Sequence, residues 1–193
     1  MKMNKKLGIV IAAASTTLVA ALTVTAISSA AGASERPDFT TLHTAQKSVA
    51  TAVDELPDVL LASGNAGDLQ TDTSRHLGRS DAAGYWSVLH ADGRLCLIVA
   101  PTADDVIVGS CSSEDAFVKH GLVLSVQDPA DPAKSFAAFL LPAAATRADV
   151  PTGFEKIGTS VLERRDANGG VPETTIGVGE SAVQLRGVEK VGR

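Results

Sequence analysis

The alternation of apolar and polar positions predicts a chain built mainly from short strands separated by turns. Strands are expected at residues 85–90, 94–100, 106–111, 122–126, 136–141, 160–164, 174–178 and 182–185. Asp92-Gly93 predicts a two-residue hairpin turn before the second of these strands. The turn-forming residues 166–170 predict pairing of strand 160–164 with strand 174–178. The expected fold is mainly β or α+β, with a mostly antiparallel sheet or small sandwich.

Two short helices and one long loop complete the expected elements. Apolar residues recur at helical spacing between Ala45 and Leu56, and Pro57 is expected to end that helix. A second helix is expected over residues 112–121, with serines at its start and Gly121 at its end. Residues 63–74 are rich in Gly, Asn, Asp and Thr and predict a loop.

Cys96 and Cys111 are the only cysteines, and each lies in an expected strand. If the two face each other in an antiparallel hairpin, cross-strand partners have residue numbers that sum to 207. The centre of the hairpin then falls between Ala103 and Asp104, inside the turn that Pro101 and the aspartates predict independently. Facing residues are close enough for a disulfide. Both faces of this hairpin are apolar, so we expect both to be covered.

The N-terminus has the three parts of a secretory signal. Lysines at positions 2, 5 and 6 precede an uncharged stretch over residues 7–27, and small residues follow it. The sequence Ala31-Gly32-Ala33 matches a peptidase site, so cleavage is expected between Ala33 and Ser34. The alternative is an uncleaved anchor, because residues 7–27 are long enough to cross a bilayer with the lysines inside.

The signal-like N-terminus and the expected elements divide the chain into three parts, most of it expected outside the cytoplasm. Residues 1–33 are the signal peptide or membrane anchor, and residues 34–74 are a linker with a short helix. Residues 75–193 are expected to form a disulfide-containing, β-rich extracytoplasmic domain. The expected location is therefore exported: secreted after cleavage, or anchored by a single span with the C-terminal domain outside.

Composition excludes two classes of partner. Beyond residues 1–33 the chain has 14 basic and 22 acidic residues, a net charge of −8. An acidic chain without a basic run repels phosphate backbones and anionic lipid, so nucleic acid is not an expected partner. Contact with a membrane is expected only through the N-terminal segment.

No pattern predicts a catalytic, cofactor or metal site. Ser160 lacks the second glycine of a nucleophile elbow, and a helix end explains His120 better than catalysis does. The four histidines, at positions 43, 76, 90 and 120, have no zinc-ligand spacing. Asp166-x-Asn168-x-Gly170 begins like a calcium loop but lacks its later glutamate, and Asp104-Asp105 matches turn chemistry.

Two further motifs have structural explanations. Tyr85 and Trp86 could stack on a sugar, but adjacent strand residues point to opposite faces. We therefore expect Trp86 in the core and Tyr85 at the surface. Gly177-x-Gly179 follows an expected strand but lacks the third glycine and the helix of a dinucleotide loop.

An ordered set of residues resembles a widespread, uncharacterised type of small actinobacterial protein that is exported or membrane-anchored and has a two-cysteine β-rich domain. The matching positions lie within residues 74–142: Ser74-Arg75, Tyr85-Trp86, Asp92-Gly93, Cys96-Leu97, Ser110-Cys111, Phe117, Gly121-Leu122 and Leu140-Leu141-Pro142. Such proteins often continue with Asp-Gly, where this chain has Ala143-Ala144. The resemblance implies export and a disulfide, and it brings no catalytic residues.

Three functions follow as hypotheses. The first is a non-enzymatic exported module that binds a protein or cell-envelope component. The second is a membrane-anchored extracytoplasmic sensor or accessory subunit. The third is a hydrolase without a recognisable motif, which would require His90 or His120 near a serine and a carboxylate.

Overall fold

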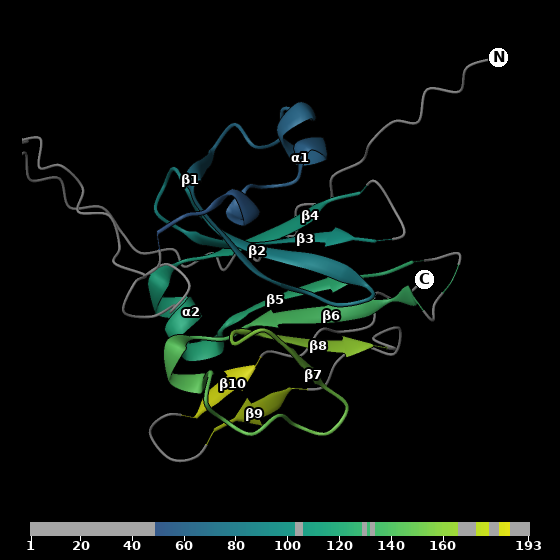
Figure 1. Cartoon of the computed structure of the whole chain (residues 1–193). Coiled ribbons are helices and arrows are strands. Elements are labelled where there is room, and N and C mark those ends of the chain that lie inside the picture. The colour runs from purple at the N-terminus through teal and green to yellow at the C-terminus, as the bar shows by residue number, and fades with distance from the viewer. Residues whose placement is uncertain are drawn as a thin grey trace, which may run out of the picture.

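The strands assemble into two four-stranded antiparallel sheets and one two-stranded sheet (Figure 1). The computed structural model describes residues 49–102, 106–128, 131, 134–165, 173–177 and 182–185. The first sheet, ordered β1-β2-β3-β4, contains β1 (Leu69–Arg79), β2 (Ala83–His90), β3 (Leu95–Pro101) and β4 (Val108–Ser112). The second, ordered β5-β6-β8-β7, contains β5 (Leu122–Val126), β6 (Phe136–Leu140), β7 (Glu155–Ile157) and β8 (Val161–Arg165). The third pairs β9 (Thr174–Ile176) with β10 (Val183–Leu185).

Short helices connect and cover these sheets. They are the 3-10 turns η2 (Ala52–Asp54) and η4 (Ala143–Ala145) and the α-helices α1 (Asp58–Ala62) and α2 (Glu114–His120). Helix α2 lies where the sequence predicts it, with Ser113 at its N-cap and Gly121 at its C-cap. The mainly β, antiparallel fold with short helices is confirmed. Within the described residues, no helix has the length and apolarity needed to span a membrane.

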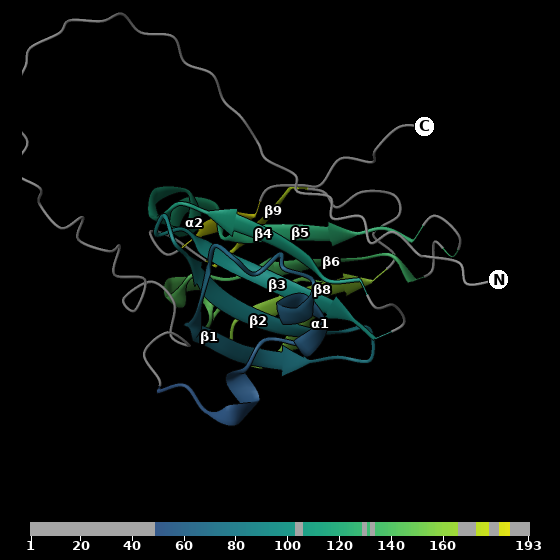
Figure 2. The ribbon, with the colours of Figure 1, turned by 90° about the horizontal axis from the view of Figure 1, so that it is seen from above.

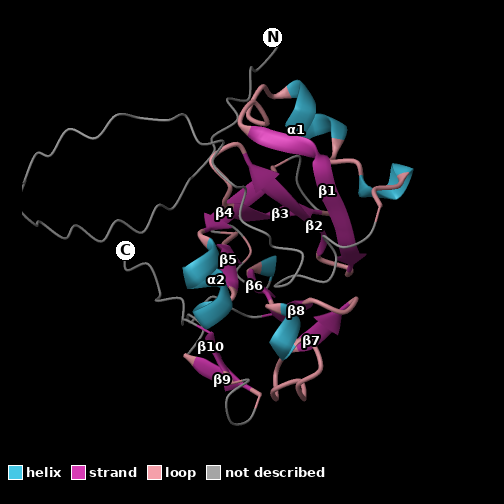
Figure 3. Cartoon of the chain, turned by 90° about the vertical axis from the view of Figure 1, so that its left-hand side faces the viewer, coloured by secondary structure: helices cyan, strands magenta, loops and turns pink. Residues whose placement is uncertain are grey.

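The main core lies between the two four-stranded sheets, which stack face to face in Figures 1 and 3. Alternation along each strand sends every second side chain into this core. The first sheet contributes Leu95, Leu97 and Val99 from β3, and the second contributes Phe136 and Leu140 from β6. All five are almost completely buried.

The outer faces of both sheets are also apolar and covered. Leu56 and Leu60, on either side of the start of α1, share a cluster with Trp86, Cys96 and Ile98 on the outer face of the first sheet. On the second sheet, the outer residues of β6 and β8 share a cluster with residues of β9 and β10: Phe139, Leu162, Ile176, Val183 and Leu185. The molecule therefore has four layers, in the order N-terminal segment, first sheet, second sheet and β9–β10 (Figure 3).

The cysteine hairpin has the register that the sequence predicts. Cys96 pairs with Cys111, and the flanking pairs from Leu95–Ser112 to Val99–Val108 all sum to 207. The two cysteines are joined by a disulfide. Alternate residues of the hairpin belong to the inter-sheet core and to the outer cluster, so both faces are covered. The expected turn at Ala103 and Asp104 lies outside the described residues.

The turn between β2 and β3 has three residues rather than the two expected. Leu89 pairs with Leu95, and the amide of His90 donates to the carbonyl of Arg94 at 2.9 Å. Residues 91–93 therefore form the loop. Gly93 has a φ of 86°, the left-handed conformation that closes a three-residue hairpin loop.

The N-terminal prediction is wrong about where the helix lies. Pro57 is the N-cap of α1 and does not end a helix, because its fixed φ suits the position that precedes the first helical turn. Val49 and Val53, which helical spacing places on a buried face, are 87% and 72% exposed. The loop prediction for residues 63–74 is also wrong at its end, because β1 begins at Leu69. Breaks in the β1–β2 register interrupt its apolar alternation.

The predicted pairing of strand 160–164 with strand 174–178 is wrong. β8 instead lies between β6 and β7, and β9 pairs with β10. The physical reason is that β8 begins with one apolar residue on each face: Val161 faces the inter-sheet core and Leu162 faces the outer cluster. Such a strand is favoured in the middle of a sheet rather than in a peripheral hairpin. The turn at residues 166–170 lies outside the described part of the chain.

Candidate functional site

A carboxylate, Glu163, is buried between the two four-stranded sheets. It lies on β8 and points to the same face as Val161, into the core, and its side chain has no exposed surface. An ionised carboxylate in an apolar core is costly unless it is paired and hydrogen-bonded. Glu163 therefore requires hydrogen-bond donors inside the core.

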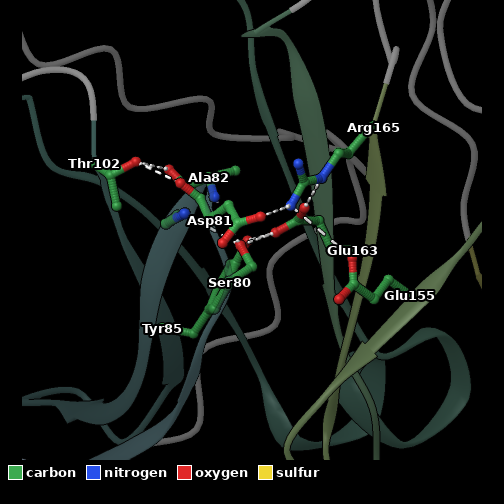
Figure 4. A network of polar contacts seen from close by, with 9 residues as sticks. Ser80, Asp81, Ala82, Tyr85, Thr102, Glu155, Glu163 and Arg165 are labelled. Atoms are coloured by element: carbon green, nitrogen blue, oxygen red, sulfur yellow. Dashed lines mark hydrogen bonds and ion pairs between the residues drawn. The ribbon is translucent and has the colours of Figure 1, made fainter.

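Three donors from two sheets surround this carboxylate (Figure 4). The phenol of Tyr85 on β2 donates a short hydrogen bond to Oε2. Ser80 Oγ donates to the same oxygen at 2.5 Å, and Arg165 Nε donates to Oε1 at 2.9 Å. We call these four residues the Glu163 network. Each carboxylate oxygen has a donor, so the negative charge is satisfied inside the fold.

Within the Glu163 network, Arg165 reaches the protein surface. It lies on β8, two residues after Glu163, and its side chain is 46% exposed. Its outer nitrogen lies 3.9 Å from Asp81 and 4.0 Å from Glu155, which are both exposed. The hydrogen bond and the charge of Glu163 raise the pKa of Arg165. The guanidinium is therefore a permanent cation at the rim of the network.

The connection between β1 and β2 fixes Ser80. Ser80 Oγ accepts hydrogen bonds from the amides of Ala82 and Ala83 at 3.1 and 3.2 Å, while its own proton goes to Glu163. Thr102, which follows β3, donates its amide to the carbonyl of Ala82 at 2.8 Å. The turn is thus tied to its own sheet by backbone bonds and to the opposite sheet by the serine.

Tyr85 is held in its protonated form. Burial raises the pKa of Tyr85 well above its ordinary value, and the hydrogen bond to Glu163 raises it further. The phenol therefore remains a donor at neutral pH and is not available as a phenolate base or nucleophile. Tyr85 and Glu163 are both buried, so the hydrogen bond between them links the two sheets inside the core.

This shift predicts a pH dependence of stability. Above about pH 10 the phenol ionises in the unfolded chain but stays protonated in the folded protein. The unfolded state then binds fewer protons, so the free energy of unfolding should fall as pH rises above about 10. Urea denaturation across that range should show the fall, and Tyr85→Phe should show less of it.

The chain has a single tyrosine, so near-ultraviolet phenolate absorbance reports Tyr85 alone. The phenolate signal should appear together with unfolding. A phenolate that forms near pH 10 while the protein stays folded would contradict the assignment.

The expectation that Trp86 is buried in a core cluster is confirmed, whereas the expectation that Tyr85 lies at the surface is wrong. Tyr85 faces the core between the sheets and is fully buried. Trp86 faces the outer cluster beneath Leu56 and Leu60, next to the ring of His76 at 5.1 Å. The surface position expected for Tyr85 is wrong because the second sheet covers this face of β2. Neither ring is an open platform for a sugar.

The three residues considered for a hydrolase, Ser160, His120 and His90, contact different partners. Ser160 is buried, and its hydroxyl lies 3.1 Å from that of Thr159. His120 Nδ1 lies 3.3 Å from the carbonyl of Gln184, and His90 Nδ1 lies 2.7 Å from Asp92. The described structure therefore does not assemble these residues into a catalytic arrangement.

Metal-ligating side chains do not converge in the part of the chain that the structure describes. There, no group of three or more His, Cys, Asp and Glu residues could hold a metal ion. The candidates at residues 104–105 and 166–170, the cleavage site at Ala33 and Ser34, and His43 all lie outside the described residues.

Sequence reasoning missed the Glu163 network. One signal was available: Glu163 shares a strand face with Val161, so an inward-facing carboxylate follows from alternation alone. Its partners Tyr85 and Ser80 are about eighty residues away in the chain, at separations of 78 and 83. Only the stacking of the two sheets brings them together.

No protein-family model, curated protein or solved structure matches this chain. The function is therefore inferred from the geometry described above.

Proposed function

We propose that this chain is exported and acts outside the cytoplasm as a non-enzymatic module that binds a protein or a cell-envelope component. The observation that carries the proposal is the disulfide between Cys96 and Cys111. Disulfides persist in oxidising compartments and are rare in the cytoplasm. A disulfide at this place in the structure is therefore consistent with an extracytoplasmic location, which the signal-like residues 1–33 also favour.

The burial and hydrogen bonding of the Glu163 carboxylate support a non-enzymatic role. A catalytic carboxylate must reach a substrate, directly or through one water. Glu163 is fully buried, and its oxygens already accept bonds from Tyr85, Ser80 and Arg165. Since both faces of both large sheets are also covered, a partner would contact loops, strand edges and the outer layers.

Export is tested by the N-terminus of the mature protein. The full chain with a C-terminal tag is expressed in an actinobacterial host, and the tagged product is purified separately from medium and membrane. We expect a chain that begins at Ser34 and has no free thiols. A product that keeps residues 1–33 in the membrane would contradict cleavage and favour an anchored sensor or accessory subunit. Free thiols in the exported product would contradict the proposed location.

Binding is tested with the same exported product. We expect saturable co-sedimentation with isolated actinobacterial cell-envelope fragments. Pretreatment of the fragments with protease distinguishes the two partner classes: loss of binding identifies a protein, and retention identifies an envelope polymer. Sedimentation that does not saturate, or is absent, would contradict the proposed function.

A further inference from the structure

The Cys96–Cys111 disulfide lies beneath a short N-terminal segment. Cys96 faces outward from β3, yet it is fully buried in the cluster that contains Leu56 and Leu60. Figure 2 shows α1 lying across β2 and β3 on this face. We call residues 51–62, which include η2 and α1, the strap.

Asp54 fastens the strap to β1. Its Oδ1 accepts a hydrogen bond from the amide of His76 at 2.7 Å, and its main-chain carbonyl accepts one from Ser74 Oγ at 2.6 Å. Oδ2 accepts hydrogen bonds from the amide and the hydroxyl of Thr51 at 2.7 and 2.8 Å. Burial alone would raise the pKa of Asp54, but the backbone hydrogen bonds from Thr51 and His76 outweigh burial and lower it. Asp54 is therefore an ionised clasp between the strap and the first sheet.

Beyond this clasp the strap contacts the first sheet through few buried side chains. Helix α1 has five residues, too few to be stable alone. The strap's buried apolar side chains are Leu56 and Leu60, whereas Val59 and Leu61 are 43% and 45% exposed. Segments with few buried side chains open at a lower free energy than the whole domain. The strap is thus suited to opening while both large sheets stay intact.

We propose that the strap controls access of external dithiols to the Cys96–Cys111 disulfide. A dithiol thiolate attacks one sulfur, forms a mixed disulfide and releases the other cysteine as a thiolate. The second thiol of the reagent then displaces the remaining cysteine, so the reagent is oxidised by two electrons and both cysteines become thiols.

Both directions of attack require the open strap. Attack on Cys96 is blocked while the strap is closed, since this cysteine is fully buried in the cluster to which the strap contributes Leu56 and Leu60. Attack on Cys111, which lies on the edge strand β4 and is partly exposed, releases Cys96 as a thiolate inside the apolar cluster. Apolar surroundings raise a thiol pKa and make it a poor leaving group. Lifting the strap admits water and removes both obstacles.

The test measures the rate at which dithiothreitol reduces the full chain. Asp54→Ala should increase that rate by roughly tenfold or more, the effect of losing one or two net hydrogen bonds. Asp72→Ala is the matched control, because Asp72 is an exposed aspartate on β1, and it should leave the rate unchanged. The single tryptophan, Trp86, lies beneath the strap. Asp54→Ala should therefore change its fluorescence, and Asp72→Ala should leave it unchanged.

A second control separates strap opening from global unfolding. Phe139→Ala destabilises the outer face of the second sheet, away from the strap. Urea is used to match its stability to that of Asp54→Ala. At equal stability, faster reduction of Asp54→Ala supports the proposal, and equal rates would overturn it. If Asp54→Ala does not fold, Ser74→Ala removes one clasp bond and is compared in the same way. An unchanged rate in that folded variant would also overturn the proposal.

Discussion

Replacing Glu163 with alanine should lower the free energy of unfolding by about 2–5 kcal/mol, because it leaves two hydroxyl groups without their acceptor. Tyr85 is fully buried and Ser80 is partly buried, and both donate to the lost oxygen. The alanine also leaves a cavity between the sheets. Urea denaturation at neutral pH measures the loss.

A graded series tests whether the network stabilises the fold through Glu163. Tyr85→Phe removes one of three donors and should cost about 1–2 kcal/mol. Arg165→Ala should cost less, about 1 kcal/mol or below, because the guanidinium is half-exposed and its attraction is screened by water. If Arg165→Ala proved the most damaging of the three, the network would depend on the surface ion pair and our assignment would be wrong.

Replacing both Cys96 and Cys111 with serine should cost about 2–5 kcal/mol, since the cross-link is lost and hydroxyls enter an apolar cluster. The bridge spans a sequence separation of 15 residues. In the chain-entropy model, a loop of this size stabilises the fold by about 3 kcal/mol. Urea denaturation of the oxidised parent and the double variant gives the difference.

The double replacement by alanine is the matched control. It removes the bond without adding hydroxyls, so it should lie between the parent and the serine variant. A serine variant as stable as the oxidised parent would contradict a stabilising role for the disulfide in the first sheet.

The cysteine hairpin could be predicted from the sequence because its signals are local and agree. The cysteines, Pro101 and the apolar runs all define one register, and the observed pairs follow it. Helix α2 was predictable for a similar reason, since Ser113 and Gly121 mark its two ends in the sequence.

Other parts depended on distant contacts. β1 is a polar edge strand with breaks in its register, so its alternation does not identify it. The position of β8 between β6 and β7 depends on the covering of both its faces. The partners of Glu163 and the orientation of Tyr85 follow from the stacking of two sheets. Sequence pattern alone does not place one sheet against another.

The four-layer arrangement determines how much of the chain a self-sufficient fragment must include. The N-terminal side of the chain supplies the layer over the first sheet, and β9–β10 supply the layer over the second. A fragment starting at residue 75 would lack the strap and leave Trp86 and Ile98 uncovered. Exposed apolar faces of this kind promote aggregation. The shortest fragment that keeps all sheet faces covered therefore extends from residue 51 to residue 185, so both outer layers belong to the folding unit.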